Sequence, residues 1–216
     1  MSQGEIPDIK QELLIHIRNA DIISTSDRGV TTSTDTGTFS ADSSHTLATN
    51  PTLVKNVRSV VVATVTLSFG TDYTVNYNTG VISFTSPQTG AYTIQYDQGS
   101  NDRIFPDFPQ PYLKRGQFPR IAVDVLGGPS TPAGTGSTTA DYNNYTVSIV
   151  SYDSDQENVE TMIAAIRRTI KDNKKDFYNF RYITPTTLSP ILPVPFGENK
   201  IMSRTQDCLI QNQFES

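Results

Sequence analysis

The sequence predicts an α+β protein: a small mixed sheet packed with two helices, carrying an inserted all-β domain that is a meander or a sandwich. Three observations lead to this fold class. Two segments, one near the N-terminus and one after residue 155, repeat apolar residues at helical spacing. Residues 57–96 instead alternate apolar and polar positions between turn signals. A polar tract precedes these strands and a proline-rich stretch follows them, so we expect residues 24–100 to be inserted between 1–23 and 101–216.

Composition narrows the classes of function. The chain has 216 residues, a length that is enough to bury a core, and 36% of them are hydrophobic and 18% charged. A net charge of −5 argues against broad binding to a phosphate backbone, but it suits a channel through which DNA passes without adhering. The single cysteine, Cys208, excludes an internal disulfide and indicates a reducing compartment. We expect no signal peptide and no membrane span.

The N-terminal segment predicts a helix over residues 7–19, because Ile6, Ile9, Leu13 and Ile17 recur at helical spacing. We expect His16 to lie on the surface of this helix without a partner. The following tract, residues 24–52, contains almost no large apolar side chains. It is therefore expected to be a linker or loop, with His45 simply solvated.

The β-segment predicts four strands of a small meander. They are expected in 57–69, 72–77, 81–85 and 91–96, with a hairpin turn at Gly80 and a second turn at Pro87–Gly90. Aromatic residues on these strands could form an exposed face that stacks on a partner or a sugar, although they would serve equally well as strand formers and core. These candidates are Tyr73, Tyr77, Tyr92 and Tyr96.

The C-terminal half predicts a hairpin followed by a long helix. Residues 101–120 are proline-rich and extended, and the alternating strands 120–126 and 145–152 are joined by a long tip at 127–144. Ser154–Glu157 has the pattern of a capping box, and it opens the clearest helix of the chain. The apolar stripe of this helix comprises Val159, Met162, Ile163, Ile166 and Ile170.

The remaining segments predict two strands separated by an arm. Residues 176–183 alternate as a strand, residues 184–199 carry four prolines and read as a semi-extended arm, and residues 200–214 form a final strand.

No catalytic, metal-binding or cofactor-binding constellation is recognisable. Cys208 is expected to be a small buried hydrophobe, and Asp153 and Asp155 are explained by helix capping. Arg167 and Arg168 could face a partner, or they could be the solvated end of a helix favoured by its dipole. The sequence therefore favours a protein that is not an enzyme and that carries no metal or cofactor.

The flanks resemble a known family. The order helix, hairpin, long helix and strands, with "FPRIAVDV", "YTVSIVSYD" running directly into "SDQENVETMIAAIRRTI", and the closing "NKIMSRTQDCLIQ", resembles the tail terminator (tail-tube capping) proteins of tailed bacteriophages. The inserted segment "GTDYTVNYNTGVISF" looks like the small β-modules of phage virion proteins.

This resemblance implies a structural virion protein that assembles in the host cytoplasm and lies at the head–tail joint. It implies a ring, commonly of six copies, that caps the tail tube. The implied partners are further copies of the chain, the tail tube protein, the head-completion or neck proteins, and DNA that passes through the lumen without specific binding. Contacts are expected through strand addition or arm exchange. The candidate contact residues are Tyr145, Val147, Arg167, Arg168, Pro190, Pro193, Pro195 and Phe196.

Two other functions stay open. The first is a head-completion neck protein, an adaptor or a stopper, which would also form a ring. The second is a carbohydrate-binding or adhesive virion module centred on residues 53–97.

Overall fold

The computed structural model describes residues 6–47, 50, 53–106, 118–132, 140–174, 177–180, 182–196 and 199–215. The chain divides into two compact units, and each is described by itself. The first, called here the flank unit, comprises Met1–Ile23 and Arg103–Ser216. The second, the inserted unit, comprises Ser24–Asp102.

The predicted fold class is wrong. In its described part the protein is mostly β, with 57% strand and 20% helix, and the described strands form a five-stranded and a six-stranded sheet. The sequence reading underestimated the strand content because several strands are polar or proline-rich and show no apolar alternation. Backbone pairing with a neighbouring strand, which does not depend on side-chain type, keeps these segments extended.

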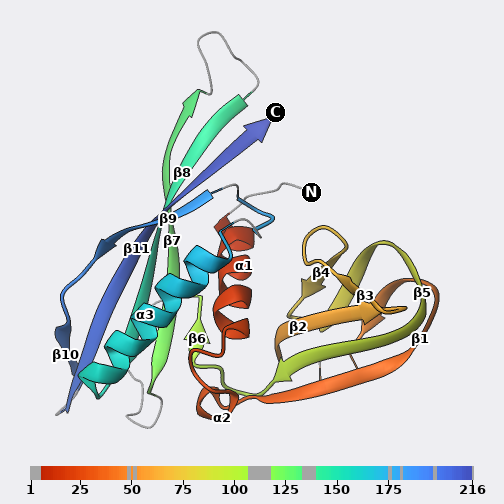
Figure 1. The fold of residues 1–216 in the computed structure, drawn as a ribbon, viewed down its shortest axis with the longest axis horizontal. Helices are drawn as coiled ribbons and strands as arrows, with labels where there is room; N and C mark the ends of the chain where they lie inside the picture. Colours follow the sequence, from red (N-terminus) through yellow and green to blue (C-terminus); the bar gives the residue numbers. More distant parts are fainter. Residues whose placement is uncertain are drawn as a thin grey trace. The chain divides into compact units, whose positions relative to one another are not determined.

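The flank unit contains two helices and six strands in the described residues (Figure 1). Its elements are α1 (Ile6–Asn19), β6 (Ile104–Phe105), β7 (Arg120–Pro132), β8 (Ala140–Asp153), α3 (Gln156–Asp172), β9 (Tyr182–Leu188), β10 (Leu192–Phe196) and β11 (Asn199–Glu215). The sheet order is β10-β11-β8-β7-β6, and β9 also pairs with β11. The β6–β7 pair is parallel and the other pairs are antiparallel.

The core of the flank unit lies between the helices and one face of this sheet. In the middle of the three long strands, alternate residues are buried against the helices: Ile121, Val123 and Val125 of β7, Val147 and Ile149 of β8, and Cys208 and Ile210 of β11. The predicted α3 stripe, Val159, Met162, Ile163, Ile166 and Ile170, is confirmed as buried. The N-cap, however, is Asp155, whose carboxylate accepts a hydrogen bond from the Glu157 N–H, and not Ser154.

A buried carboxylate ties α1 to the segment after α3. Glu12 is 1% exposed and accepts hydrogen bonds from the backbone N–H groups of Tyr178 and, at 2.8 Å, Asn179. Burial raises the pKa of Glu12 above its ordinary value of 4.5, and the two backbone donors only partly offset that effect. Glu12 therefore stabilises a loop that no regular pairing holds.

Replacing Glu12 tests this role. Glu12→Ala removes the carboxylate that accepts from the part-buried Tyr178 N–H and the buried Asn179 N–H, so we expect the flank unit to lose about 2 kcal/mol of unfolding free energy. Glu12→Gln retains one acceptor and should lose less. Because the pKa is raised in the folded state, the wild type should also lose stability as the pH rises from 4.5 through the raised pKa. Urea unfolding as a function of pH measures both effects, and an unchanged pH slope in Glu12→Gln would contradict the assignment.

The described residues of the inserted unit form one short helix and five strands: α2 (Thr25–Arg28), β1 (Thr31–Thr46), β2 (Val54–Val62), β3 (Val65–Leu67), β4 (Tyr73–Asn76) and β5 (Val81–Gln98). The sheet order is β1-β5-β2-β3, with β4 also paired to β5. The core of this unit comprises Phe39, Leu47, Val54, Val57, Val60, Val62, Tyr73, Ile82, Phe84, Ile94 and Tyr96.

Two predictions for the inserted unit are wrong. Residues 24–52 are not a linker, because α2 and the 16-residue strand β1 occupy much of this range. Only Phe39 of β1 is buried, so the strand gave no apolar signal and is held by its pairing with β5. The turn expected at Pro87–Gly90 is also absent, since β5 continues through it opposite β1.

The arm and the strand before it are likewise corrected. The strand predicted at 176–183 begins only at Tyr182, because Glu12 holds the preceding residues in a loop. Residues 184–199 are not a free arm. They contain most of β9 and all of β10, both of which pair with β11.

Candidate interaction surface

The face of the flank sheet that points away from the helices carries exposed apolar side chains. Cross-strand pairing places Leu126 of β7, Thr146 of β8, Leu209 of β11 and Thr184 of β9 in one row. Leu126 is 53% exposed and Leu209 is 42% exposed. Tyr182, two residues before Thr184 on the same face of β9, is 53% exposed. We call Leu126, Leu209 and Tyr182 the apolar patch.

An acidic row adjoins the apolar patch on the same face. Asp124, Ser148 and Asp207 pair across β7, β8 and β11, two residues along each strand from the first row. Ser148 Oγ donates to Asp207 Oδ1 at 2.7 Å. Asp124 Oδ1 accepts from Lys10 Nζ at 3.1 Å and from the Val125 N–H at 3.0 Å. This part of the sheet is therefore partly apolar and partly anionic.

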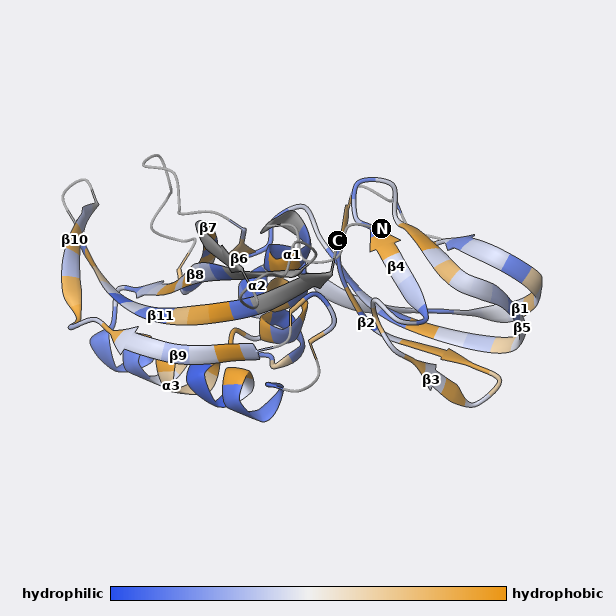
Figure 2. Cartoon of the chain, turned by 90° about the horizontal axis from the view of Figure 1, so that it is seen from above, coloured by the Kyte–Doolittle hydropathy of each residue, from blue (hydrophilic) through white to orange (hydrophobic). Residues whose placement is uncertain are grey.

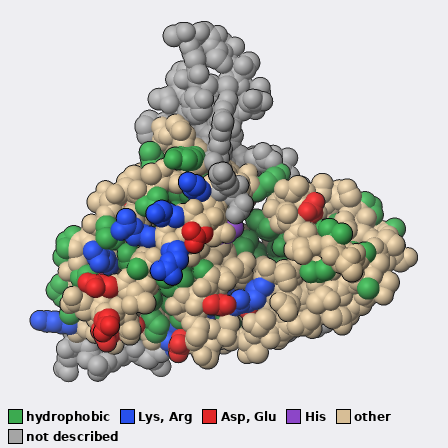
Figure 3. Space-filling model, in the orientation of Figure 1, with side chains coloured by type: hydrophobic (Ala, Val, Ile, Leu, Met, Phe, Trp, Pro, Cys, Tyr) green, Lys and Arg blue, Asp and Glu red, His purple; other side chains and the backbone are tan. Residues whose placement is uncertain are grey.

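The opposite side of the flank unit carries charges of both signs, with cationic side chains at the C-terminal end of α3. The outer face of α3 is hydrophilic (Figure 2), and Lys and Arg side chains gather on the helix-bearing face of the molecule (Figure 3). Arg167, Lys171 and Lys174 are exposed, and their spacing of four and three residues places them along one side of the chain as it leaves α3. Arg168 is exposed as well. We call Arg167, Lys171 and Lys174 the basic stripe.

The sheet edges are poorly suited to the strand addition expected from the sequence. At β7, the Ile121 N–H donates to Arg103 O, and the Val125 N–H is capped by the Asp124 carboxylate. At the other edge, Pro193 and Pro195 of β10 have no N–H to donate. Natural sheets use such devices against edge-to-edge pairing, so the sheet face is the better candidate for contact.

The predicted contact residues lie in different places. Arg167 and Arg168 are exposed on α3. Val147 is fully buried under the helices, so it is not available to a partner, and Tyr145 is half-buried and packs against the same core.

The proline residues of the predicted arm are exposed. Pro190 precedes β10, and Pro193 and Pro195 lie within it. The Phe196 side chain lies outside the described part. The loop predicted at 127–144 is wrong over most of its length, because β7 continues to Pro132 and β8 begins at Ala140, and only residues 133–139 lie outside the described part.

The tyrosines predicted to form an exposed face of the inserted unit mostly face its core. Tyr73 and Tyr96 are each 4% exposed, which contradicts their assignment. Tyr77 and Tyr92 are half-buried against the same core. The Tyr92 ring stacks on Phe39 at 4.1 Å and covers Gly37, where an added Cβ would lie 2.7 Å from the Tyr92 hydroxyl. These rings fill space within the unit and offer no continuous stacking platform.

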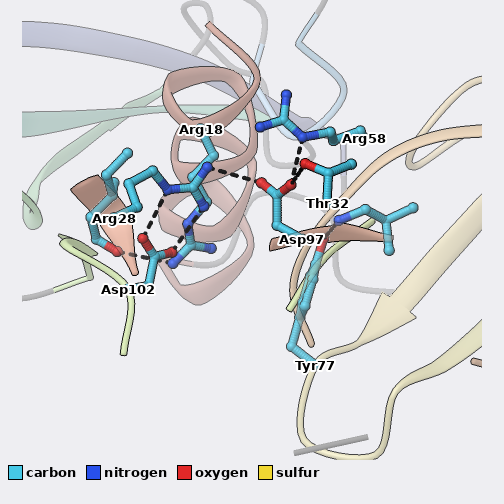
Figure 4. Close-up of polar contacts among 9 residues, drawn as sticks. Arg18, Arg28, Thr32, Arg58, Tyr77, Asp97 and Asp102 are labelled. Carbon is cyan, nitrogen blue, oxygen red and sulfur yellow. Dashed lines mark hydrogen bonds and ion pairs between the residues drawn. The ribbon is translucent and has the colours of Figure 1, made fainter. Parts of the chain in front are cut away.

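A buried network of charges closes the inserted unit where its two ends meet (Figure 4). Asp97 accepts hydrogen bonds from Arg28 at 2.9 Å, Arg58 at 2.6 Å and Thr32 at 2.8 Å. Arg28 also donates to both carboxylate oxygens of Asp102, at 3.0 and 3.2 Å. Arg28 and the Asp97 side chain are 0% exposed. Because these charges satisfy one another away from solvent, the network is structural.

The reactive residue types do not converge on a site. Among the described residues, no three His, Cys, Asp or Glu side chains are placed to hold a metal ion. Cys208 is buried as expected, which raises the pKa of its thiol to about 12. His16 packs on Phe177, with ring centroids 4.6 Å apart. His45 is not simply solvated, because it pairs with Asp35 at 2.9 Å.

None of the helices in the described residues has both the length and the apolar character needed to cross a bilayer.

Sequence reasoning missed Leu126, Leu209 and Tyr182 as surface residues. A signal was present in two cases. Leu126 follows Val125, and Leu209 stands between Cys208 and Ile210, so each interrupts the alternation of its strand. An apolar residue next to an inward-facing one must point to the opposite face. Tyr182 had no such signal, because its strand was placed too early.

The comparisons with known proteins leave the family of this chain open: no protein-family model matches it, and a search of curated proteins gives no match.

Proposed function

We propose that this chain is a structural virion protein that forms a ring capping the tail tube of a tailed bacteriophage and joining it to the neck proteins. The observation that carries the proposal is the apolar patch, which leaves Leu126 and Tyr182 each 53% exposed on a sheet face without helices. Large apolar side chains grouped on a surface favour a protein–protein contact. The resemblance of the flank segments to tail terminators supplies the kind of assembly.

The order of elements supports this assignment. In the flank unit, α1 is followed by the β7–β8 hairpin, α3 begins three residues after β8 ends, and β11 returns beside β8. These are the segments on which the resemblance rests. The inserted unit forms a compact body of its own between α1 and the hairpin. In this proposal the partners are further copies, the tail tube protein and the neck proteins, while DNA passes through the lumen without specific binding.

Electron microscopy and light scattering of the purified protein test the proposal. We expect discrete rings, because a contact between two different surfaces repeats until the chain of copies closes. A species that remains monomeric at the highest soluble concentration would count against a ring. Antibodies raised against the protein should label the head–tail joint of the virion. Labelling at fibres or at the head surface would favour the adhesive alternative.

A further inference from the structure

The two sides of the flank unit carry charges of opposite sign, and among the described residues only Asp124 of the acidic row has a cationic partner within the unit, Lys10. On the outer sheet face, Oδ1 of Asp124 is ion-paired with Lys10 at 3.1 Å and Oδ1 of Asp207 accepts only from the Ser148 hydroxyl, while Oδ2 of each has no hydrogen bond with any described residue. On the helix side, the basic stripe of Arg167, Lys171 and Lys174 is exposed. One side therefore offers acceptors beside the apolar patch, and the other offers donors on long aliphatic stems.

The spacing of the two carboxylates on the sheet matches the spacing of the basic stripe. Asp124 and Asp207 are separated by two strand intervals, roughly 10 Å. Arg167 and Lys174 are seven residues apart, roughly 10 Å at the helical rise that α3 keeps as far as Asp172. A helix that crosses the strands could thus place Arg167 and Lys174 over the two carboxylates. Lys171 would then lie over Ser148, and the aliphatic stems would lie near Leu126 and Leu209.

We propose that copies of this chain associate head to tail, with the basic stripe of one copy docked across the acidic row and apolar patch of the next. This inference rests on the proposed ring and names the surfaces that build it. Because the two surfaces differ, the contact is heterologous and leaves each copy with one unused surface of each kind. Repetition of the contact therefore closes into a ring if the rotation between copies allows it.

A second copy explains more of the surface than a nucleic acid does. DNA could bind the basic stripe, but it would leave Leu126, Leu209 and Tyr182 exposed to water, and the chain as a whole carries a net charge of −5. A second copy covers the stripe and the patch with one contact. Charge pairing of this kind also sets the register between two surfaces.

Charge exchange in the full-length protein tests the contact. The helix variant carries Arg167→Glu and Lys171→Glu, and the sheet variant carries Asp207→Lys and Leu209→Lys. Sedimentation velocity should show that each variant alone self-associates at least about tenfold more weakly than the wild type. An equimolar mixture should recover assembly, because each variant keeps one wild-type surface and the two altered surfaces again have opposite charges.

Controls separate the possible failures. Lys200→Glu, an exposed charge reversal outside both surfaces, should assemble like the wild type. Circular dichroism and thermal melting verify that each variant is folded. Disulfide trapping provides a second measurement that does not depend on the measured affinity. It tests whether Lys171→Cys in one copy forms a disulfide with Ser148→Cys in another, in a Cys208→Ser background.

The outcomes have distinct meanings. If the wild type assembles and both variants assemble equally well, the docking surfaces are wrong and the proposed ring stands. If the helix variant assembles normally but loses binding to duplex DNA, the stripe is a nucleic-acid surface and the inference is overturned. If the wild type never assembles, both the ring and the inference fail.

Discussion

Replacing Asp97 by asparagine is expected to lower the unfolding free energy of the inserted unit by about 3 kcal/mol, because two buried or partly buried guanidinium groups then lose their shared carboxylate. Arg28 keeps Asp102 as a partner, but Arg58 loses its ion pair with Asp97 at 2.6 Å, because the amide that replaces the carboxylate carries no charge and only one acceptor oxygen. The isosteric amide preserves the volume of the side chain. The loss therefore reports charge and hydrogen bonding rather than packing.

The same variant has a signature in its pH dependence. Burial alone would raise the pKa of Asp97, but hydrogen bonds from Arg58 and Thr32 and the charge of Arg28 outweigh it and hold the pKa below its ordinary value of 3.8. A depressed pKa means that the carboxylate stabilises the fold above pH 3.8 and that this contribution is lost as the pH falls through the depressed pKa. Asp97→Asn should lack this acid-dependent loss, so the two proteins should converge in stability at low pH.

Hydrogen exchange is the appropriate measurement, because a chain of two compact units need not unfold in one step. Protection of β5 amides should fall in Asp97→Asn, while protection of β8 amides should be unchanged. Asp172→Asn, at an exposed carboxylate on α3, is the matched control and should change stability by less than about 0.5 kcal/mol. Equal protection of β5 in the wild type and in Asp97→Asn would refute the structural role of the network.

Ile166→Ala is expected to destabilise the flank unit by about 3 kcal/mol. Ile166 is 0% exposed in the middle of the buried stripe of α3, so truncation removes apolar contacts and leaves a cavity between helix and sheet. Alanine is the better helix former, so the loss cannot come from helix propensity. The loss of unfolding free energy in Ile166→Ala therefore measures packing alone.

The control for this prediction lies on the same helix. Thr161 is exposed on α3, and Thr161→Ala should leave the stability unchanged or slightly raised. Urea denaturation monitored by hydrogen exchange of the β8 and β11 amides would give the change in unfolding free energy for both variants. A loss below about 1 kcal/mol in Ile166→Ala would mean that the helix does not close the core as described.

Some elements of the fold could be predicted from the sequence pattern and others could not. Helix α3 was predictable because its buried stripe repeats at helical spacing, and β7 and β8 were predictable because their apolar residues alternate. Strand β1 was not predictable. Fifteen of its 16 residues are not buried, and what keeps it extended is a ladder to β5 some fifty residues further along the chain. A local pattern contains no information about such a partner.

The candidate interaction surface was likewise only partly predictable from the sequence. The sequence by itself determined the helix with its cationic C-terminal end, the alternating strands, the absence of recognisable catalytic motifs and the compositional change around the insertion. Only the tertiary structure decided that Leu126, Leu209 and Tyr182 share one exposed face beside Asp124 and Asp207, and that Tyr73 and Tyr96 are buried. The physical reason is register. Alternation states that neighbouring residues face opposite sides, but strand pairing decides which residues of distant segments lie together and which side the helices cover.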